Sequence, residues 1–286
     1  MNNSYIIIST IKNQEDTINS TLESVINQTI LPAEWLIVDD LSTDNSANII
    51  KEYTKTYSWI KYLKNNEVLK NEKGARIASI INTHLKYIQT KNFEFIAKLD
   101  GDILLPRNFY EYFLLAFHKH KNLGIASGSL KFNGKVEKNI YPELTRGATK
   151  FYRRSCFIDI KGLQLTTGWD SLDNIIAQKQ GWTTQTLEIT FDHLEEEGVS
   201  QGFIQKYYQV GRYCGKIPYH TWYFIAKVAY NVFKKPILFS SLIMIYGYIE
   251  AKYIVKERPF PKDVSNYFRS KQRNLLIGAI KNILNL

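Results

Sequence analysis

The feature that most constrains the fold is an alternation of short β-branched runs with stretches of helical periodicity over about the first 130 residues. Five runs are predicted to be strands, and they span residues 5–11, 34–40, 58–63, 93–100 and 123–130. Between the first two runs, Ile18, Leu22 and Val25 recur at the spacing of one helical face. Strands that alternate with helices predict an α/β fold, in which a mostly parallel central sheet is flanked by helices.

Polar residues stand at the ends of the first two predicted strands. Thr10 and Lys12 close the first strand, and Asp39 and Asp40 close the second. In open parallel sheets, ligands bind beyond the carboxyl ends of the strands, so we expect these side chains to converge on a binding site. A carboxylate there can accept a hydrogen bond from the imide of a uracil or from a ribose hydroxyl.

The fourth predicted strand lies in FEFIAKLDGDILLP and ends in Asp100-Gly101-Asp102. Side chains alternate along a strand, so the two carboxylates point the same way if the chain stays extended, and Gly101 permits a sharp turn. Paired carboxylates so placed can hold a divalent cation. A polar turn that simply ends a strand explains the tripeptide equally well.

Two further segments each allow a structural and a functional interpretation. In NEKGARIAS, Gly74 and Arg76 lie at the start of a predicted helix, where a guanidinium and free N–H groups suit a diphosphate. A solvated arginine is the alternative. In VDDLSTDNS, we expect Ser42, Thr43 or Asp44 to cap the helix that follows, and Asp44 is the favoured candidate.

Most of the net charge of +10 lies near the C-terminal end of the sequence. Residues 216–286 hold 12 Lys and Arg against three acidic residues, and the basic residues alternate with aromatic ones. This pattern suits nucleic acid or an anionic membrane surface. The longest uncharged run, Pro236 to Ile249, has 14 residues, fewer than the roughly 20 that a membrane-spanning helix needs. We therefore expect amphipathic helices that lie on a membrane surface or pack on the preceding domain.

The cysteines and the N-terminal residues indicate the cellular compartment in which the protein is expected to fold. Cys156 and Cys214 match no metal-binding or redox spacing. The N-terminus has no basic region before its short apolar run, so it is interpreted as the first strand and not as a signal peptide. We expect a reducing cytoplasmic location, with peripheral attachment to the cytoplasmic face of the membrane as a further possibility.

Four stretches, in this order, resemble the nucleotide-binding half of a family 2 glycosyltransferase with a GT-A fold: STIKNQEDTINSTLESVINQT, LIVDDLSTDNS, GARIAS and KLDGDILLP. The resemblance covers about residues 4–200. It implies that Asp40 contacts the nucleoside, with Thr10 and Lys12 beside the base. It also implies that Asp100 and Asp102 touch the ribose and hold Mg²⁺ or Mn²⁺ on the diphosphate. The usual Pro-x-Tyr-Asn after the first strand is replaced by STIKN, which leaves the nucleotide open.

The stretch TTGWDSLDNIIAQKQGW, residues 166–182, contains the candidate general base. The family carries this base as an acidic residue at the start of a helix that follows a Gly-aromatic-Asp stretch. The resemblance therefore implies Asp173, with Asp170 as the second choice. From the residues alone, Asp170 equally fits a helix cap and Asp173 a first-turn acid. The resemblance also implies that His193, at the end of the next predicted strand, lies near the metal or the diphosphate, although a surface histidine fits as well.

These observations predict a GT-A catalytic domain over residues 1–210 and a basic amphipathic helical segment over residues 211–286. The predicted activity is metal-assisted, inverting transfer of a sugar from a UDP- or dTDP-linked donor to a saccharide or lipid-linked acceptor of the cell envelope. The expected partners are the donor, the acceptor and an anionic membrane surface, and no nucleic acid is expected. The alternative is a non-catalytic basic protein that binds membrane or nucleic acid on a nucleotide-binding scaffold. The presence of both Asp100 and Asp102 argues against this alternative.

Overall fold

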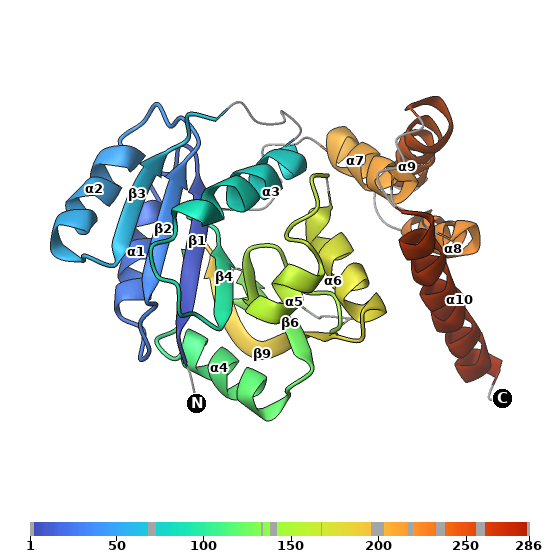
Figure 1. Cartoon of the computed structure of the whole chain (residues 1–286). Helices are drawn as coiled ribbons and strands as arrows, with labels where there is room; N and C mark the ends of the chain where they lie inside the picture. Colours follow the sequence, from blue (N-terminus) through green and yellow to red (C-terminus); the bar gives the residue numbers. More distant parts are fainter. Residues whose placement is uncertain are drawn as a thin grey trace. The chain divides into compact units, whose positions relative to one another are not determined.

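The computed structural model describes residues 3–67, 73–132, 134–137, 142–166, 168–195, 203–216, 220–232, 238–255 and 261–284. The chain divides into two compact units, Met1–Glu197 and Gly198–Leu286 (Figure 1). The division comes before helix α7 (Phe203–Lys216), whereas the boundary expected at residue 210 would cut this helix.

The described part of the first unit contains one nine-stranded sheet. Its strands are β1 (Tyr5–Ile11), β2 (Glu34–Asp39), β3 (Ile60–Lys64), β4 (Phe95–Leu99), β5 (Ile103–Leu104), β6 (Leu123–Phe132), β7 (Lys135–Val136), β8 (Thr149–Arg153) and β9 (Thr183–His193). Its helices are α1 (Ile18–Ile26), α2 (Ser46–Thr56), α3 (Lys73–His84), the 3₁₀ turn η1 (Leu85–Tyr87), α4 (Phe109–Lys119), α5 (Arg154–Asp159) and α6 (Trp169–Lys179). The five strands predicted from the sequence are confirmed as β1, β2, β3, β4 and β6, with ends that shift by up to two residues.

The sheet is parallel in one half and mixed in the other. Its order is β3-β2-β1-β4-β8-β6-β9-β5, and β7 pairs with β6. Strands β1 to β4 are parallel, whereas β8 is antiparallel to both β4 and β6, and β5 is antiparallel to β9. The mostly parallel sheet expected from the sequence therefore holds for β1 to β4 and for the β6–β9 pair.

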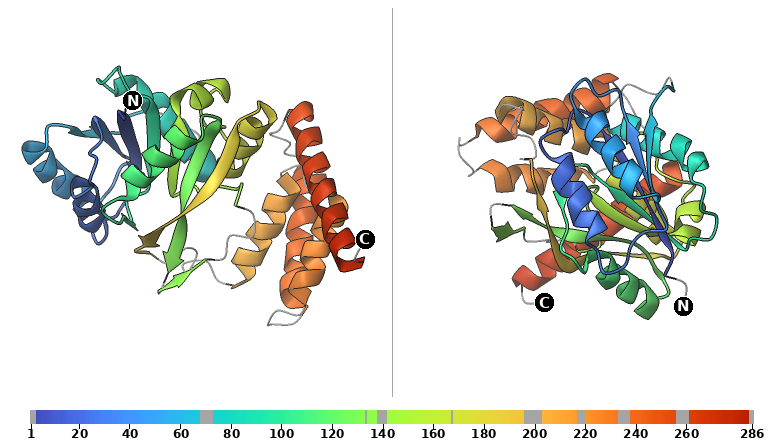
Figure 2. Two further views of the ribbon diagram at one scale, coloured as in Figure 1. Left: turned by 90° about the horizontal axis from the view of Figure 1, so that it is seen from below. Right: turned by 90° about the vertical axis from the view of Figure 1, so that its left-hand side faces the viewer.

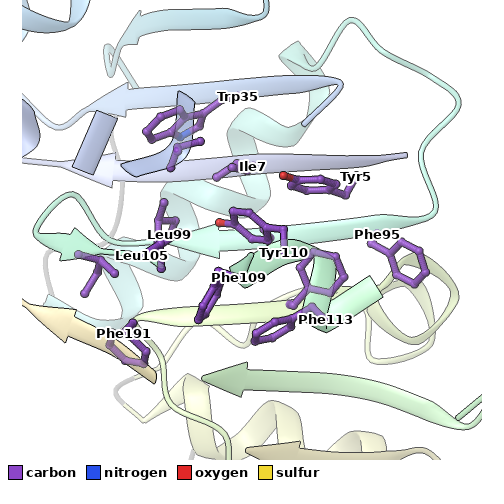
Figure 3. Packing of buried hydrophobic residues seen from close by; sticks show 14 of the residues in the cluster. Tyr5, Ile7, Trp35, Phe95, Leu99, Leu105, Phe109, Tyr110, Phe113 and Phe191 are labelled. Atoms are coloured by element: carbon purple, nitrogen blue, oxygen red, sulfur yellow. The ribbon is translucent and has the colours of Figure 1, made fainter. Parts of the chain in front are cut away.

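Alternate residues of the central strands pack into two separate cores. On one face Tyr5, Trp35 and Phe95 pack with apolar residues of α1, α2 and α4, and Figure 3 shows the aromatic part of this core. On the other face Ile6 and Ile96 pack with apolar residues of α3, α5 and α6. The views in Figure 2 show helices on both sides of the sheet. This alternation follows from the two-residue period of a strand.

The second unit consists, where it is described, of helices: α7, α8 (Thr221–Val232), α9 (Phe239–Ile249), the π-helical turn η2 (Glu250–Val255) and α10 (Lys262–Leu284). Helices α7 and α9 pack closely through glycines. A Cβ atom added at Gly211 would lie 2.1 Å from the carbonyl oxygen of Met244, and one at Gly247 would lie 2.4 Å from that of Tyr208. Of the helices described in this chain, none combines the length and the apolarity that crossing a bilayer requires.

Candidate active site

The turn after β4 is fixed by contacts with α1. The carbonyl oxygen of Gly101 accepts a hydrogen bond from the Thr21 hydroxyl at 2.8 Å, and the same hydroxyl accepts one from the Ile103 N–H at 3.1 Å. A Cβ atom at position 101 would lie 2.1 Å from Gln14 Oε1, so a side chain there would displace Gln14. Glycine at this position therefore lets the turn approach the loop after β1.

Asp102 is a buried carboxylate with one unpaired oxygen. Its Oδ1 is buried and has no hydrogen-bond partner among the described residues. Its Oδ2 lies 3.5 Å from Nδ1 of His193, because β5 pairs with β9 and sets Ile103 opposite His193. Burial, together with the charge of Asp100, raises the pKa of Asp102 to about 6, although His193 opposes the rise. A cation bound beside this carboxylate would stabilise its charged form and lower its pKa.

Asp100 points to a buried lysine but keeps part of its surface exposed. Its Oδ1 accepts an ion-pair hydrogen bond from Lys98 Nζ, and its side chain is 28% exposed, whereas that of Lys98 is 3% exposed. Among the described contacts, one carboxylate oxygen of Asp100 and one of Asp102 have no protein partner. Two such oxygens are suitable ligands for a divalent cation.

Protein groups alone do not enclose such a cation. Among the described residues, no group of three or more His, Cys, Asp and Glu side chains is arranged to hold a metal ion. Mg²⁺ is commonly bound by one or two carboxylates together with substrate phosphates. The Asp100–Asp102 pair fits that kind of site, in which a diphosphate supplies the remaining oxygen ligands.

At the end of β2, Asp40 and Arg76 form a two-point ion pair. Arg76 Nε and Nη2 lie 2.5 Å from Oδ2 and Oδ1 of Asp40, and Asn65 donates to Oδ1 at 2.9 Å. Burial alone would raise the pKa of Asp40, but these hydrogen bonds and the charges of Arg76 and Lys12 hold it below its usual value. Arg76 is thus directed at Asp40, and 22% of its side chain stays exposed.

The neighbouring Asp39 has a different environment. Its Oδ1 accepts the Ser42 N–H and its Oδ2 accepts the Tyr62 hydroxyl, both at 2.8 Å, and the residue is 1% exposed. Burial and the Asp39 carboxylate raise the pKa of Tyr62. These contacts make Asp39 a support of the β2–α2 loop rather than an open ligand. Thr10 is half-buried in β1 and Lys12 is exposed beyond it.

Polar groups join the loops that follow β1 and β2. Asn13 Oδ1 accepts the Thr43 N–H at 2.8 Å, and Asp44 accepts the N–H groups of Glu15 and Ser46 at 3.0 Å each. Asp44 therefore binds the first turn of α2, as expected for a capping residue, although Asn45 occupies the N-cap position itself. These hydrogen bonds hold the two loops together.

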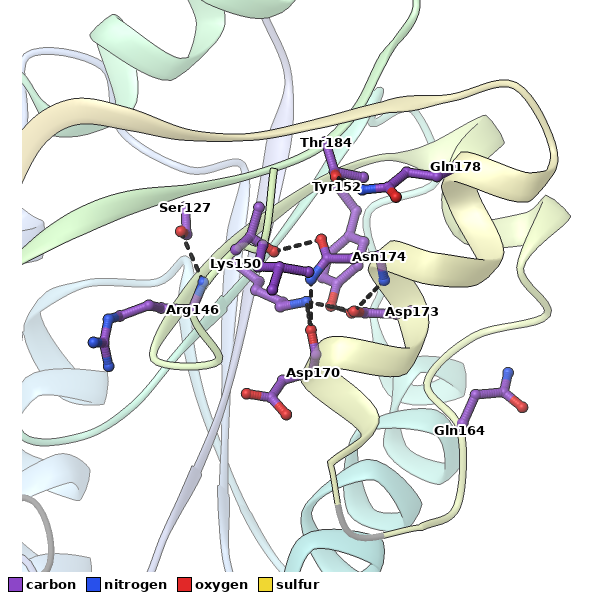
Figure 4. Close-up of polar contacts among 12 residues, drawn as sticks. Ser127, Arg146, Lys150, Tyr152, Gln164, Asp170, Asp173, Asn174, Gln178 and Thr184 are labelled. Carbon is purple, nitrogen blue, oxygen red and sulfur yellow. Dashed lines mark hydrogen bonds and ion pairs between the residues drawn. The ribbon is translucent and has the colours of Figure 1, made fainter. Parts of the chain in front are cut away.

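Asp173 lies in a closed ionic cluster inside the protein (Figure 4). It is fully buried, its Oδ1 lies 2.5 Å from Lys150 Nζ, and its Oδ2 lies 2.5 Å from the Tyr152 hydroxyl. Burial raises the pKa of Asp173 to about 6, and Lys150 and Tyr152 oppose the rise. Both oxygens of Asp173 are occupied, so this carboxylate is not open to a substrate.

Asp170 lies three residues earlier, in the first turn of α6, and is half-buried. The N-cap of α6 is Gly168, with φ of 80°, so the interpretation of Asp170 as the cap was wrong. Figure 4 shows its carboxylate directed away from Lys150 and Asp173. The carboxylate instead lies over Gly147, where an added Cβ atom would be 3.3 Å from Asp170 Oδ2.

The family model of glycosyl transferase family 2 matches residues 5–169, which include β1 to β8 and every one of the candidate donor-side residues from Thr10 to Asp102. The chain belongs to this family. It is a glycosyltransferase, and the non-catalytic alternative is set aside. The matched segment ends one residue before Asp170.

Two curated relatives of this family 2 glycosyltransferase are named for teichoic acid biosynthesis and for a diphosphoundecaprenol-linked acceptor. The minor teichoic acid biosynthesis protein GgaB of Bacillus subtilis is 33% identical over 123 residues, 42% of this chain and 13% of that protein. The Escherichia coli β-1,3-glucosyltransferase WfgD, named for UDP-Glc and α-D-GlcNAc-diphosphoundecaprenol, is 39% identical over 99 residues, 35% of each chain. The first relatives are matched over 13%, 43% and 27% of their own lengths, so each of them extends well beyond the shared segment.

Solved structures of low sequence identity show the GT-A fold. The mannosyltransferase PcManGT of Pyrobaculum calidifontis, solved with GDP-Man and Mn²⁺, has a TM-score of 0.58 at 14% identity over 98% of this chain and 87% of that one. S. aureus TarS, solved with UDP-GlcNAc, has a TM-score of 0.55 at 18% identity over 74% of this chain and 65% of that one. The GT-A fold expected for the glycosyltransferase is confirmed.

The sequence did not reveal Lys150 and Tyr152 as the partners of Asp173. Both lie on β8, a five-residue strand buried along its whole length, and both reach the α6 side of the sheet. A lysine beside two aromatic residues in the short run TKFYR was the available signal, because lysine is almost never fully buried without a partner.

Proposed function

We propose that this glycosyltransferase moves a sugar from a nucleotide diphosphate donor to a saccharide or lipid-linked acceptor of the cell envelope, with inversion at the anomeric carbon. The observation that carries the proposal is the Asp100-Gly101-Asp102 turn at the carboxyl end of the parallel strands, with a buried and unpaired Asp102 oxygen. Relatives named for teichoic acid and for poly-β-1,6-N-acetyl-D-glucosamine support an envelope acceptor. TarS, solved with UDP-GlcNAc, supports a UDP-linked donor, and dTDP remains the second choice.

In the proposed mechanism, Asp100 and Asp102 would hold Mg²⁺ or Mn²⁺ together with the donor diphosphate, and His193, whose Nδ1 contacts the Glu195 carbonyl, lies 3.5 Å from Asp102. A divalent ion so held supplies positive charge for the leaving diphosphate oxygens. Both oxygens of Asp40 accept hydrogen bonds from Arg76 or Asn65, so on the nucleoside side Asp40 would act by holding the Arg76 guanidinium in place. The exposed Lys12 and the half-buried Thr10 would border the base, and the part of Arg76 that stays exposed would contact the diphosphate.

The acceptor side needs a base, and the geometry favours Asp170 over Asp173. Inversion requires a group that takes the proton of the acceptor hydroxyl on the face opposite the leaving group. Asp173 has both oxygens bonded inside the core, whereas the Asp170 carboxylate is half-buried and has no hydrogen bond of its own among the described contacts. We therefore assign the base to Asp170, which reverses the ranking made from the sequence.

A thermal-shift panel tests the donor class. UDP-, dTDP- and GDP-sugars are compared with and without Mn²⁺, because binding to the folded state raises its apparent stability. We expect a UDP- or dTDP-sugar to raise the melting temperature in the presence of Mn²⁺ and to lose this effect in EDTA. A shift of the same size in EDTA would contradict the metal-assisted mechanism, and a response to GDP-sugars alone would contradict the donor class.

We propose further that the second unit binds an anionic membrane surface. Along α9 and η2 five large apolar side chains alternate at three- and four-residue spacing and are exposed: Phe239 (60%), Leu242 (62%), Tyr246 (63%), Ile249 (46%) and Tyr253 (58%). The opposite face of α9, with Met244 and Gly247, packs on α7. An apolar stripe in a strongly basic segment suits a helix that lies in the headgroup region. The excess of nine positive charges in residues 216–286 opposes pairing with a second copy and favours anionic lipid.

We predict that Phe239→Ser, Leu242→Ser and Ile249→Ser together lower binding to vesicles containing anionic phosphatidylglycerol by roughly tenfold. Each substitution removes an apolar side chain that would be buried in the membrane. Co-sedimentation measures the bound fraction. Raising the salt concentration should weaken the wild type as well, because it screens the lipid charge.

The matched control is Leu115→Ser with Ile158→Ser, which removes two equally exposed apolar side chains, each 63% exposed, from the first unit. This variant should bind vesicles as the wild type does. Equal binding of the wild type to neutral and anionic vesicles would contradict the proposed binding to an anionic membrane, and so would unchanged binding of the triple variant.

A further inference from the structure

Two buried lysines face each other across neighbouring strands of the sheet. The antiparallel register of β4 and β8 sets Lys98 opposite Lys150, and the residues are 3% and 0% exposed. Like charges directly opposite one another are unfavourable, and burying each of them costs solvation. Apolar side chains would fill the same space without this cost, so packing alone does not explain the pair.

Each lysine is directed at a different part of the active site. Lys98 donates to Asp100, the exposed carboxylate of the donor side. Lys150 donates to Asp173 and to the main-chain carbonyl of Asp170, both in the first turns of α6. The two ammonium groups thus join the tip of β4 to the start of α6.

Trp169 completes this link as the first residue of α6. The ammonium groups of Lys98 and Lys150 each lie 5.6 Å from the centre of its ring, and the residue is 5% exposed. A tryptophan face attracts cations at this distance. The ring therefore stabilises both lysines and ties the backbone next to Asp170 to them.

The position of Asp170 is fixed by contacts on several sides. Its carbonyl oxygen accepts Lys150 Nζ and also the Asn174 side-chain amide at 2.7 Å. Its carboxylate lies against Gly147, where the absence of a side chain leaves room for it. Burial lowers the pKa of Lys150, and the charges of Asp173 and Asp170 oppose this fall and favour the ammonium form.

We propose that Lys150 is a positioning residue for glycosyl transfer. It holds the first turn of α6 through the carbonyl oxygen of Asp170. Trp169 contacts both Lys150 and Lys98, and Lys98 binds Asp100. Asp170 thereby keeps a fixed position relative to the metal-binding Asp100. This inference rests on the proposed role of Asp170 as the base. Lys150 itself is buried and touches neither donor nor acceptor.

The test replaces the buried ion pair as a unit, with Lys150→Met and Asp173→Asn in one protein, because a single change would leave an unpaired buried charge. The assay follows release of UDP from UDP-N-acetylglucosamine with Mn²⁺ and water as acceptor, or uses the better donor from the thermal-shift panel. We expect kcat to fall roughly 10- to 100-fold, the scale of a small misplacement of a reacting group. Affinity for UDP with Mn²⁺, measured by calorimetry, should stay within about threefold, because the donor-side carboxylates are unchanged.

Two further variants separate positioning from general destabilisation. Arg153→Met removes another buried basic side chain of β8, which donates to the carbonyl oxygens of Phe117 and Leu123 on the other face. It should lower the melting temperature and leave kcat unchanged. Trp169→Phe keeps an aromatic ring at this position but weakens the cation–π contact with both ammonium groups. It should lower kcat several-fold at unchanged UDP affinity.

The outcomes distinguish this inference from the proposed function. If Asp170→Asn loses turnover while the Lys150→Met/Asp173→Asn variant and Trp169→Phe keep the wild-type kcat, the positioning role is wrong and the base assignment stands. If Asp170→Asn also keeps the wild-type kcat, the base assignment fails and the positioning role fails with it. A parallel loss of UDP affinity and kcat in the double variant would point to a disturbed fold and would also overturn the inference.

Discussion

Asp102→Asn is expected to abolish both metal-dependent donor binding and glycosyl transfer without loss of the fold. The substitution keeps the size of a side chain whose Oδ1 has no protein partner, so little native bonding is lost. A ligand at 100 times its dissociation constant stabilises a protein by about 2.7 kcal/mol, which corresponds to roughly 5–10 °C in melting temperature for a unit of this size. In the variant this Mn²⁺- and UDP-dependent shift should disappear.

Asp192→Asn is the matched control for Asp102→Asn. Asp192 precedes His193 on β9 and is directed at Lys131, 3.6 Å away, so it lies outside the proposed metal site. Its variant should keep the full thermal shift and turnover. If the Mn²⁺-dependent shift survives in Asp102→Asn, the assignment of Asp102 to the metal is wrong.

Asp170→Asn is expected to lower transfer by roughly 10²- to 10⁴-fold, the usual contribution of a general base. Donor affinity should change little, because Asp40, Asp100 and Asp102 are untouched. The melting temperature should also change little, since the Asp170 carboxylate is half-buried and lies apart from the Lys150 cluster. Steady-state kinetics, calorimetry with UDP and Mn²⁺, and thermal unfolding measure the three quantities.

Asp173→Asn provides the contrast to Asp170→Asn. It removes the partner of a fully buried lysine, and breaking such a pair costs about 3–5 kcal/mol. The melting temperature should therefore fall strongly, and any loss of turnover should accompany this instability. A variant of Asp170 that transfers at the wild-type rate, beside a stable but inactive Asp173 variant, would restore the assignment made from the sequence.

The parallel part of the fold follows from the sequence because its signal is local. Runs such as YIIISTI are β-branched and buried along their length, and the helices between them carry one apolar face. The convergence of Asp40 and Asp100 at one edge then follows from parallel pairing. The Asp-Gly-Asp turn was also visible, because it directly follows a strand that the sequence predicts.

What the sequence did not predict depends on contacts between distant residues. β8 was missed because TKFYR is short and carries two basic residues, so only its partners on both sides identify it as a buried strand. Arg76 and Asp40 are 36 positions apart, and the fold alone brings them together. The proposed order of Asp170 and Asp173 differs from the one expected from the sequence, because α6 begins at Trp169 and Asp173 is fully buried.

The lysine of β8 also bears on how the sheet assembles. Successive residues of a strand point to opposite faces of the sheet and so belong to different cores. A slip of β8 by one position would therefore carry Lys150 into the aromatic cluster around Phe95 and Phe117. There it would meet neither Asp173 nor the ring of Trp169. An unpaired ammonium among aromatic side chains is costly, so the misregistered sheet is disfavoured from the moment it forms. The buried charge of Lys150 therefore helps to specify the register of β8 between β4 and β6.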